Sequence, residues 1–429
     1  MKAFSYLLMS LLFLASCREQ PETSYTAIRS LKGLETQGFA PDRLTRIDQM
    51  MEEAIAAGEI PGGVALIARN GNIVYHKAFG QSNTAEGTAF QKNDIFRIAS
   101  QTKAITSTAV MMLWEEGHFQ LDEPISKYIP EFENTGVLAS FVESDSSFTT
   151  TPLTTPITIR HLLTHTSGIG YGMIDSDPRI RKAFAKAGIV DAFTAEAITL
   201  KENVPKIAQM PLHHQPGEAW TYSEGLDVLG RFVEIVSGMP FDQFLKSRIF
   251  DPLGMVDTAF YLSEEKANRL VSVQHKEDGQ WRLFETDVYD TNYPIRGAKR
   301  FFSGGAGLSS TARDYYVFLQ MMLNKGTYNE VRLLSRTTVE TMMVNQIGDL
   351  WKGGPTDFNL AFSVVNDKGI AKGGLGGPGT FEWGGYFNTQ YFADPGEQLI
   401  GILMKQTQGD SGDQTGWKFK QMVFASIAD

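Results

Sequence analysis

The chain has 429 residues, of which 42% are hydrophobic and 21% are charged. This composition supports a large buried core and excludes a wholly disordered chain. The formal net charge is −10, from 39 basic and 49 acidic residues. No basic stripe with interleaved aromatic residues is present, which argues against nucleic-acid binding.

The first residues resemble an export signal. Lys2 precedes an apolar stretch from Phe4 to Ala15, which is too short to span a bilayer and has the length of a signal-peptide core. We expect residues 1–16 to be a signal peptide.

The end of this stretch, Leu14-Ala15-Ser16-Cys17, resembles the lipobox at which a bacterial signal peptidase cuts before a lipid-modified cysteine. Cys17 is the only cysteine in the chain, which excludes internal disulfides, Cys-x-x-Cys redox sites and a cysteine-based zinc site. We expect a lipoprotein lipidated at Cys17, with a flexible tether over residues 17–40, exported and held at a membrane of the bacterial cell envelope by acyl chains. An ordinary secretory signal with a chance cysteine is the alternative.

The next segments predict a helix and a β-hairpin. Arg43 to Ala57 has helical periodicity and stops at Gly58. The apolar runs Val64–Ala68 and Ile73–Lys77 flank Asn70-Gly71, which is a strong hairpin signal.

Ser100-Gln101-Thr102-Lys103 opens the longest apolar helical run, which continues to Trp114. Residues three apart lie on one helix face, so the Ser100 hydroxyl and the Lys103 amine can meet. A buried lysine can lose its proton and act as the base that activates a serine nucleophile. A second Ser-x-x-Lys pattern, Ser263-Glu264-Glu265-Lys266, has polar neighbours and is predicted to be a surface helix N-terminus.

The middle of the chain is largely helical. Ser140 to Thr158 is rich in Ser, Thr and Pro, and we expect a surface loop there. Pro216-Gly217 marks a turn before Tyr222, and Leu226–Gly230 begins a helix. A tyrosine held in such a loop can relay a proton if a lysine lies nearby; the alternative is a half-buried tyrosine beside a helix cap.

Phe381-Glu382-Trp383-Gly384-Gly385-Tyr386 leads into the C-terminal strands. Paired glycines let backbone approach a substrate closely, and a strand edge offers N–H groups as an oxyanion hole; the alternative is a glycine bulge. Thr389–Ala393 and Gln398–Met404 flank the turn Asp394–Glu397, and a closing helix is expected from about Gln414.

Strands at both ends and helices between them predict the fold class. We expect an α/β (α+β) domain over residues 41–429, in which an antiparallel sheet built from both chain ends is flanked by helices. A large, mainly helical subdomain is inserted in it.

In this order and spacing, the elements around Ser100, Tyr222 and Trp383 resemble the serine β-lactamase-like superfamily of class C β-lactamases and penicillin-binding proteins. The closest pattern is that of the family VIII carboxylesterases. The resemblance runs from about Asp42 to the C-terminus. Five further segments carry it: Phe96-Arg97-Ile98-Ala99-Ser100, Leu121-Asp122-Glu123-Pro124, Arg160–Gly168, Phe250–Met255 and Gly305–Thr311.

The resemblance implies a role for each motif residue. Ser100 is the acylated nucleophile and Lys103 is its proton partner. Tyr222 activates Ser100, protonates the leaving group and then activates the deacylating water. The backbone N–H groups of Ser100 and Tyr386 form the oxyanion hole.

Two departures from the lactamase pattern bear on the substrate. That pattern has Tyr-x-Asn where this chain has Tyr222-Ser223-Glu224, and it has Lys-Thr-Gly where this chain has Trp383-Gly384-Gly385, as family VIII esterases do. Losing a hydrogen bond to a charged group costs roughly 1.5–3 kcal/mol, so a β-lactam carboxylate is held less well. We expect Glu224, Trp383, Gly384 and Gly385 to contact the substrate, and an ester with an apolar or aromatic group to fit better.

Three other patterns are rejected. Gly374–Gly379 fits G-x-G-x-x-G but precedes a strand, whereas a dinucleotide fold needs a strand before it and a helix after it. His161 and His165 have zinc spacing, but the adjacent glutamate and a third ligand are missing. Gly409–Gly412 resembles a trypsin-like segment in a chain with no other feature of that class.

The sequence therefore predicts a serine hydrolase that uses no metal or cofactor and acts on a small ester or amide, most simply a carboxylesterase for short-chain or aromatic esters. A class C-like β-lactamase or a peptidase for D-amino-acid peptides would use the same chemistry. A non-catalytic binding lipoprotein of the cell envelope is the alternative from another class. The intact set Ser100, Lys103 and Tyr222 argues against it, because a pure binder does not need all three.

Overall fold

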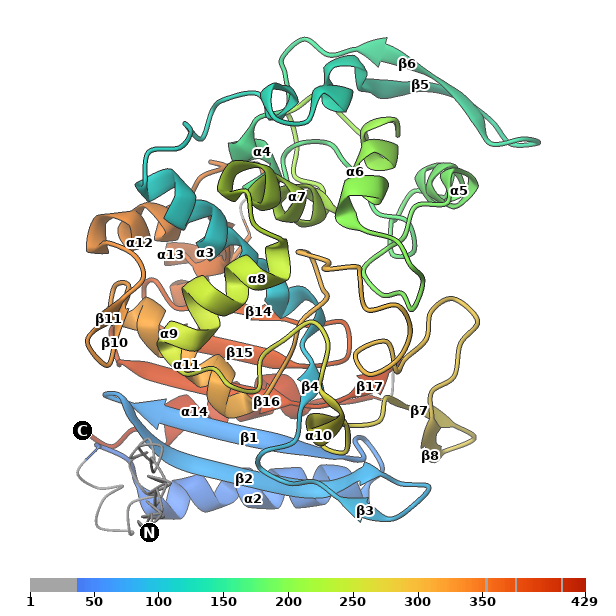
Figure 1. Ribbon diagram of the computed structural model, residues 1–429. Helices are drawn as coiled ribbons and strands as arrows, with labels where there is room; N and C mark the ends of the chain where they lie inside the picture. The colour runs from blue at the N-terminus through green and yellow to red at the C-terminus, as the bar shows by residue number, and fades with distance from the viewer. Residues whose placement is uncertain (1–36, 352–353, 375, 410–411) are drawn as a thin grey trace, which may run out of the picture.

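A computed structural model describes residues 37–351, 354–374, 376–409 and 412–429. The predicted signal peptide, Cys17 and most of the predicted tether lie outside the described residues. The central element is an eight-stranded antiparallel sheet in the order β12-β13-β14-β15-β16-β1-β2-β3 (Figure 1). Its strands are β1 Gly62–Arg69, β2 Asn72–Asn83, β3 Thr88–Ala89, β12 Thr356–Phe358, β13 Ser363–Val365, β14 Phe381–Gly384, β15 Gln390–Asp394 and β16 Leu399–Met404.

The two ends of the chain meet in the middle of this sheet. β1 pairs with β16 in a register that runs from Val64 opposite Met404 to Arg69 opposite Leu399. Every residue of β1 is buried, because both faces of the strand are covered. This pairing confirms the prediction of one sheet built from both termini.

The alternation of side chains in β1 divides the interior into two cores. Ala65 and Ile67 face α2 (Pro41–Ala56) and α14 (Thr415–Ala425), which pack against one face of the sheet. Val64, Leu66 and Ala68 belong to the larger core on the opposite face. Figure 1 shows the helices of the middle region on that side of the sheet.

The middle region is mainly helical, as predicted. Its longest helices are α3 Thr102–Glu115, α7 Gly225–Ser237 and α11 Ala312–Leu323. The shorter ones are η1 Ala99–Gln101, η2 Ile125–Lys127, η3 Pro130–Asn134, α4 Ile159–Leu163, α5 Pro178–Ala187, α6 Leu200–Ala208, α8 Phe241–Leu245, η4 Lys246–Phe250, α9 Asp251–Leu253, α10 Glu264–Ala267, α12 Arg336–Met343 and α13 Asp367–Lys372.

One prediction in this region is wrong. Most of the expected loop from Ser140 to Thr158 belongs to a hairpin of β5 (Gly136–Val142) and β6 (Ser147–Pro152), which projects from the helical region (Figure 1). The Ser/Thr content suggested a loop, but threonine is β-branched and favours strands. Phe148 also packs against the small core around Phe184, which anchors the hairpin.

In the described part of the chain, no helix has the length and apolar character required to cross a bilayer.

Short strands complete the fold, and the pair of β4 and β9 lies directly before Ser100 in the chain. The remaining strands are β4 Phe96–Arg97, β7 Gln274–Glu277, β8 Gln280–Leu283, β9 Ser309–Ser310, β10 Thr327–Tyr328, β11 Val331–Arg332 and β17 Thr407–Gln408.

Candidate active site

Ser100 lies in a tight turn between a strand and a helix. β4 pairs with β9, and the chain then enters η1 and continues into α3. Ala99 has φ +43°, a left-handed conformation that is uncommon and strained for a residue other than glycine. The buried Arg97 guanidinium holds this turn, since it donates to the carbonyls of Thr291 and Val271 at 2.6 and 2.7 Å.

The structure brings the three predicted catalytic side chains together. The Tyr222 hydroxyl donates to Ser100 Oγ at 2.7 Å, and Lys103 Nζ donates to the same oxygen at 3.4 Å. Lys103 Nζ also lies 4.6 Å from the centroid of the Tyr222 ring. Tyr222 is therefore the closer proton partner of Ser100, and the lysine lies against both.

Lys103 is held in place by groups that the sequence analysis did not identify. Lys103 is buried, with 4% of its surface exposed. Its Nζ donates to the Gly305 carbonyl at 2.8 Å and to the Tyr171 hydroxyl at 2.9 Å. Burial raises the pKa of Tyr171 well above its usual value, so this phenol stays protonated at neutral pH. Its sequence signal is weak: Tyr171 follows the matched segment Arg160–Gly168 by three residues.

A buried carboxylate supports the carbonyl that binds Lys103. Asp227, in the first turn of α7, accepts hydrogen bonds from the Gly305 N–H at 2.7 Å and from Ser303 Oγ at 2.8 Å. Burial raises the pKa of Asp227 above its ordinary value. An acidic residue among the apolar residues of this helix was the available signal, and the sequence analysis missed it.

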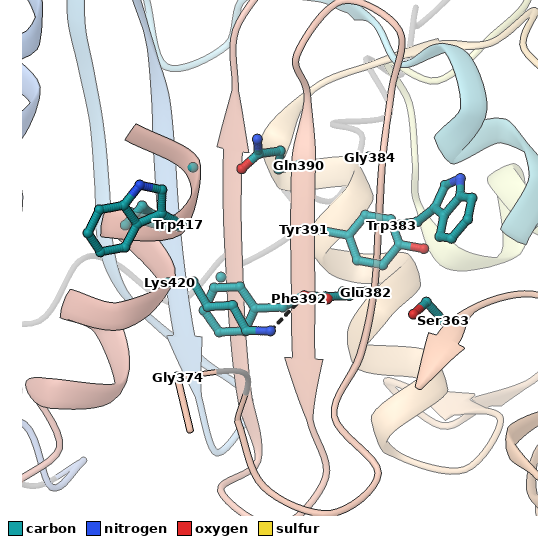
Figure 2. A pocket seen from close by; sticks show the side chains of 13 residues that line it. Ser363, Gly374, Glu382, Trp383, Gly384, Gln390, Tyr391, Phe392, Trp417 and Lys420 are labelled. Atoms are coloured by element: carbon teal, nitrogen blue, oxygen red, sulfur yellow. Dashed lines mark hydrogen bonds and ion pairs between the residues drawn. The ribbon is translucent and has the colours of Figure 1, made fainter. Parts of the chain in front are cut away.

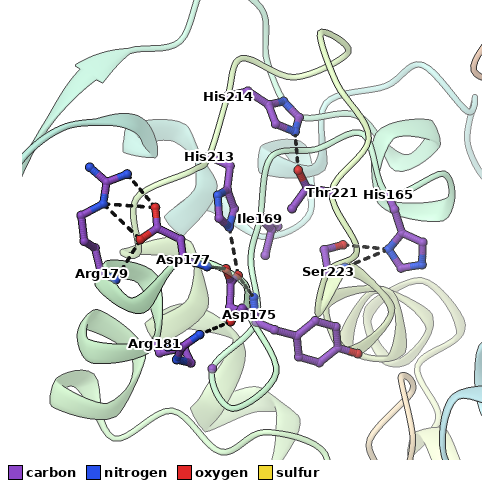
Figure 3. A network of polar contacts seen from close by, with 12 residues as sticks. His165, Ile169, Asp175, Asp177, Arg179, Arg181, His213, His214, Thr221 and Ser223 are labelled. Carbon is purple, nitrogen blue, oxygen red and sulfur yellow. Dashed lines mark hydrogen bonds and ion pairs between the residues drawn. The ribbon is translucent and has the colours of Figure 1, made fainter. Parts of the chain in front are cut away.

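The loop that carries Tyr222 is fixed by His165. The His165 ring lies 4.7 Å from the Tyr222 ring. Its Nδ1 accepts from the Ser223 N–H at 3.2 Å and lies 3.0 Å from Ser223 Oγ (Figure 3). Burial lowers the pKa of His165 well below its usual value, so the imidazole is neutral. His161 Nδ1 accepts from the Thr158 N–H at 3.2 Å. Both histidines thus have structural contacts in the loops around Tyr222.

A second polar network fixes the segment of Tyr171. Asp175 accepts from the Tyr171 N–H at 2.8 Å and from the His213 imidazole at 2.9 Å (Figure 3). The contacts of the carboxylate with His213 and with backbone N–H groups outweigh burial and lower the pKa of Asp175. An ionised Asp175 therefore orders the chain directly before it.

The predicted oxyanion segment lies against the segment that carries Ser100. A Cβ atom on Gly385 would lie 2.4 Å from the Ile98 carbonyl oxygen and 2.3 Å from Thr389 Oγ1, so only glycine allows this approach. The Gly385 N–H donates to the Thr389 carbonyl at 2.8 Å, which closes the turn containing Tyr386. Assignment of the Ser100 and Tyr386 N–H groups as the oxyanion hole stays a prediction.

β14 directs neighbouring side chains to opposite faces of the sheet. Figure 2 shows Trp383 on one side, while Glu382 contacts Lys420 of α14 on the other. The Lys420–Glu382 distance is 2.6 Å. The centroid of Trp383 lies 5.9 Å from that of Tyr222, so Trp383 and the following Gly384 are beside the candidate catalytic residues.

Glu224 has a different position from the other predicted substrate contacts. The residue is 1% exposed, and neither carboxylate oxygen has a hydrogen-bond partner in the described part of the chain. A substrate could reach it only after neighbouring groups moved, and its contact with substrate stays a prediction. The second Ser-x-x-Lys copy is on the surface: Ser263 is exposed before α10, and Lys266 pairs with Asp257 at 3.2 Å.

Known proteins resemble this chain over most of its length. A sequence model of the family described as Beta-lactamase matches residues 47–421. Esterase EstB from Burkholderia gladioli is 32% identical over 389 residues, covering 86% of this chain and 92% of EstB. A lovastatin esterase from Penicillium rubens is 30% identical over 383 residues, covering 83% of this chain and 91% of that enzyme. The solved structure of EstCE1, titled a hydrolase with promiscuous acyltransferase activity, has a TM-score of 0.75 at 24% identity and covers 90% of this chain and 98% of its own.

Proposed function

Because the chain belongs to the Beta-lactamase family and is an enzyme of the serine hydrolase class, we propose that it is a carboxylesterase that forms an acyl-enzyme on Ser100. The observation that carries the proposal is the 2.7 Å contact between the Tyr222 hydroxyl and Ser100 Oγ, beside Lys103. The names of EstB and the lovastatin esterase support esters as the substrate class.

In the structure the Tyr222 hydroxyl donates to Ser100 Oγ. Acylation therefore requires Tyr222 to release its own proton to solvent first, after which the Tyr222 oxygen takes the proton of Ser100 beside Lys103. The Ser100 oxygen then attacks the ester carbonyl carbon, and the carbonyl oxygen becomes an oxyanion. Backbone N–H groups of Ser100 and Tyr386 stabilise this charge. When the intermediate collapses, the bond to the alcohol oxygen breaks, and Tyr222 returns the proton to that oxygen.

Deacylation repeats these steps with water. Tyr222 takes a proton from the water, the hydroxide attacks the acyl carbon, and Ser100 leaves with the proton that Tyr222 returns. Lys103 stabilises the negative charge on the Tyr222 oxygen in both halves, since it lies 4.6 Å from that ring. The products are a carboxylic acid and an alcohol.

Labelling of the purified soluble domain with a fluorophosphonate, together with p-nitrophenyl butyrate hydrolysis, tests the nucleophile. Ser100→Ala should abolish both, because it removes the hydroxyl that lies beside Tyr222 and Lys103. Ser263→Ala is the matched control and should behave as wild type, since Ser263 is an exposed residue in a polar surface turn. Equal loss in the two variants, or wild-type turnover in Ser100→Ala, would refute the assignment. No labelling and no turnover in wild type would favour a binding protein.

Comparison of esters with nitrocefin tests the substrate class. Trp383 stands where a lactamase has a cation, so p-nitrophenyl esters should exceed nitrocefin in kcat/KM by at least about a hundredfold, or roughly 2.7 kcal/mol. Both activities should fall together in Tyr222→Phe, because one proton relay serves both. Nitrocefin hydrolysis as efficient as ester hydrolysis would replace the esterase proposal with a β-lactamase.

A further inference from the structure

An aromatic surface adjoins Tyr222. We call Trp220, Trp351, Phe358 and Trp383 the aromatic wall. Adjacent ring centroids lie 4.3 Å apart for Trp220 and Trp351, 5.3 Å for Trp351 and Phe358, and 5.5 Å for Phe358 and Trp383. Two of these residues also flank Tyr222, Trp383 at 5.9 Å and Trp220 at 6.1 Å.

The aromatic wall is built from segments far apart in the sequence. Trp220 lies in the loop before α7, Trp351 between α12 and β12, Phe358 at the end of β12 and Trp383 in β14. Phe358 is 2% exposed and packs against all three tryptophans, which are themselves partly exposed. Trp351 has its aromatic contacts within the wall and hydrogen-bonds none of the candidate catalytic groups, so it can be changed without removing one of them.

The spacing of the rings indicates what they can bind. A cation in an aromatic cage lies within about 6 Å of each ring centroid, with the rings on different sides of it. Five of the six ring pairs of the wall have centroids 4.3 to 6.5 Å apart, so neighbouring rings pack against one another and leave little room for a cation between them. They therefore present one shared apolar surface, suited to a flat apolar group that stacks or packs edge-on.

Tyr222 determines which part of an ester meets this surface. The leaving alcohol oxygen must come within hydrogen-bond distance of the Tyr222 hydroxyl to receive its proton. The group bonded to that oxygen then lies beside Tyr222, where Trp220 and Trp383 flank the ring. In the proposed mechanism the carbonyl oxygen points instead toward the backbone N–H groups of Ser100 and Tyr386.

We propose that the aromatic wall is the subsite for the leaving alcohol, that it selects alcohols carrying a planar aromatic group, and that Trp351 determines this preference. The inference rests on the proposed function and adds the alcohol side of the substrate to it. An aromatic group on the alcohol buries apolar surface against the three indoles, which favours aromatic alcohols over aliphatic ones.

Two pairs of unactivated esters test the inference by pH-stat assay. n-Butyl acetate and 2-naphthylmethyl acetate differ in the alcohol, whereas ethyl butyrate and ethyl 2-naphthylacetate differ in the acyl group. Wild type should prefer the naphthylmethyl ester in kcat/KM by at least about tenfold over n-butyl acetate. Trp351→Ala should remove most of this preference and leave n-butyl acetate within about threefold of wild type. The ratio within the acyl pair should not change.

Two further variants make the result decisive. Trp351→Leu retains bulk without a π face and should lose part of the preference, which separates stacking from a fold defect. Trp417→Ala removes a tryptophan that is 61% exposed on α14, across the sheet from the wall, and should keep the wild-type ratio. An unchanged alcohol ratio in Trp351→Ala, or a change confined to the acyl pair, would overturn the inference while Ser100 labelling upheld the esterase. Absence of both labelling and turnover in wild type would overturn both proposals.

Discussion

Lys103 lies between two tyrosines that have different partners. Tyr222 reaches Ser100, whereas the Tyr171 hydroxyl accepts a hydrogen bond from Lys103, and the two rings stack with centroids 5.3 Å apart. Burial keeps Tyr171 protonated by raising its pKa. Tyr171 is thus a positioning residue that fixes the ammonium group beside Tyr222.

Tyr171→Phe should lower kcat about tenfold to a hundredfold with a small change in KM. The reason is that Lys103 loses one of its three hydrogen-bonding partners, and a hydrogen bond to a charged group is worth roughly 1.5–3 kcal/mol. Steady-state kinetics with p-nitrophenyl butyrate measures the effect. Tyr316→Phe is the matched control, because it removes a buried tyrosine bond to the Gly71 carbonyl far from Ser100. Equal kcat values for the two variants would count against the role of Tyr171.

The candidate site residues that could be predicted from the sequence are those whose motifs are local. Ser100 and Lys103 are three residues apart on one helical turn, and Tyr222 follows a recognisable turn. Tyr171 and Gly305 contact Lys103 from 68 and 202 positions away along the chain. These contacts depend on tertiary packing that spacing does not reveal, so the sequence analysis could not find them.

At the level of elements, the turn after β14 depends on the contact of Gly385 with Ile98. Gly385→Ala should lower kcat by about a hundredfold or more, because the new methyl group pushes the Tyr386 N–H away from the oxyanion. Gly396→Ala is the matched control, since Gly396 lies in the turn after β15 and its Cβ would lie 3.3 Å from Asp394 Oδ1, which needs only a small adjustment. Assays of kcat and thermal unfolding on both variants separate an oxyanion defect from a fold defect. Wild-type kcat in Gly385→Ala would contradict the assigned role of this turn.

In α11, a buried acid makes stability depend on pH. Asp314 accepts from the Asp257 N–H at 2.7 Å and from Thr258 Oγ1 at 3.0 Å, and burial raises the pKa of Asp314 to about 6. A raised folded-state pKa means that its stabilising contribution is complete below about pH 4 and is lost as pH rises through about 6.

Asp314→Asn should remove this dependence. The unfolding free energy of wild type minus that of the variant should fall by roughly 1–3 kcal/mol between pH 4 and pH 7. Urea titrations of both proteins at several pH values give this difference, in which the contributions of all other groups cancel. A difference that is constant across the range, or that rises with pH, would show that Asp314 is not the group responsible.

The sequence predicts helices and strands correctly where their apolar pattern matches the side chains that the structure buries. β1 is apolar up to Arg69 and β16 is apolar throughout, because helices cover both faces of the sheet. Their turns are marked by glycine or proline. The β5–β6 hairpin was missed because β6, Ser-Phe-Thr-Thr-Thr-Pro, is rich in Ser and Thr, and because the expected loop begins at Ser140, inside β5. Its register comes from pairing and from the contact of Phe148 with the helical region, and neither is a property of composition.

At the scale of the whole molecule, the candidate site forms where the sheet meets the helical region. η1 and α3 bring Ser100 and Lys103, the loop before α7 brings Tyr222, and β14 brings Trp383. The helices that carry these residues share one hydrophobic core with the sheet, and the middle of the sheet joins strands from opposite ends of the chain. Activity should therefore be lost with global unfolding rather than in separate steps.

The last prediction concerns the attachment of the whole molecule to a membrane, which we propose takes place through acyl chains on Cys17. A single acyl chain binds a bilayer only marginally, so stable attachment requires more than one chain or a second signal. The net charge of −10 does not favour binding to anionic lipids, so high salt should not release the wild-type protein. Cys17→Ser removes the thiol that accepts the lipid, and the variant should remain an uncleaved precursor without incorporated palmitate. Metabolic labelling and Triton X-114 partitioning of both proteins provide the measurement. Specific esterase activity should be equal in the two, because Cys17 is far along the chain from Ser100, and the first described helix, α2, begins at Pro41. Palmitate incorporation and detergent partitioning equal to wild type in Cys17→Ser would show that another group carries the anchor.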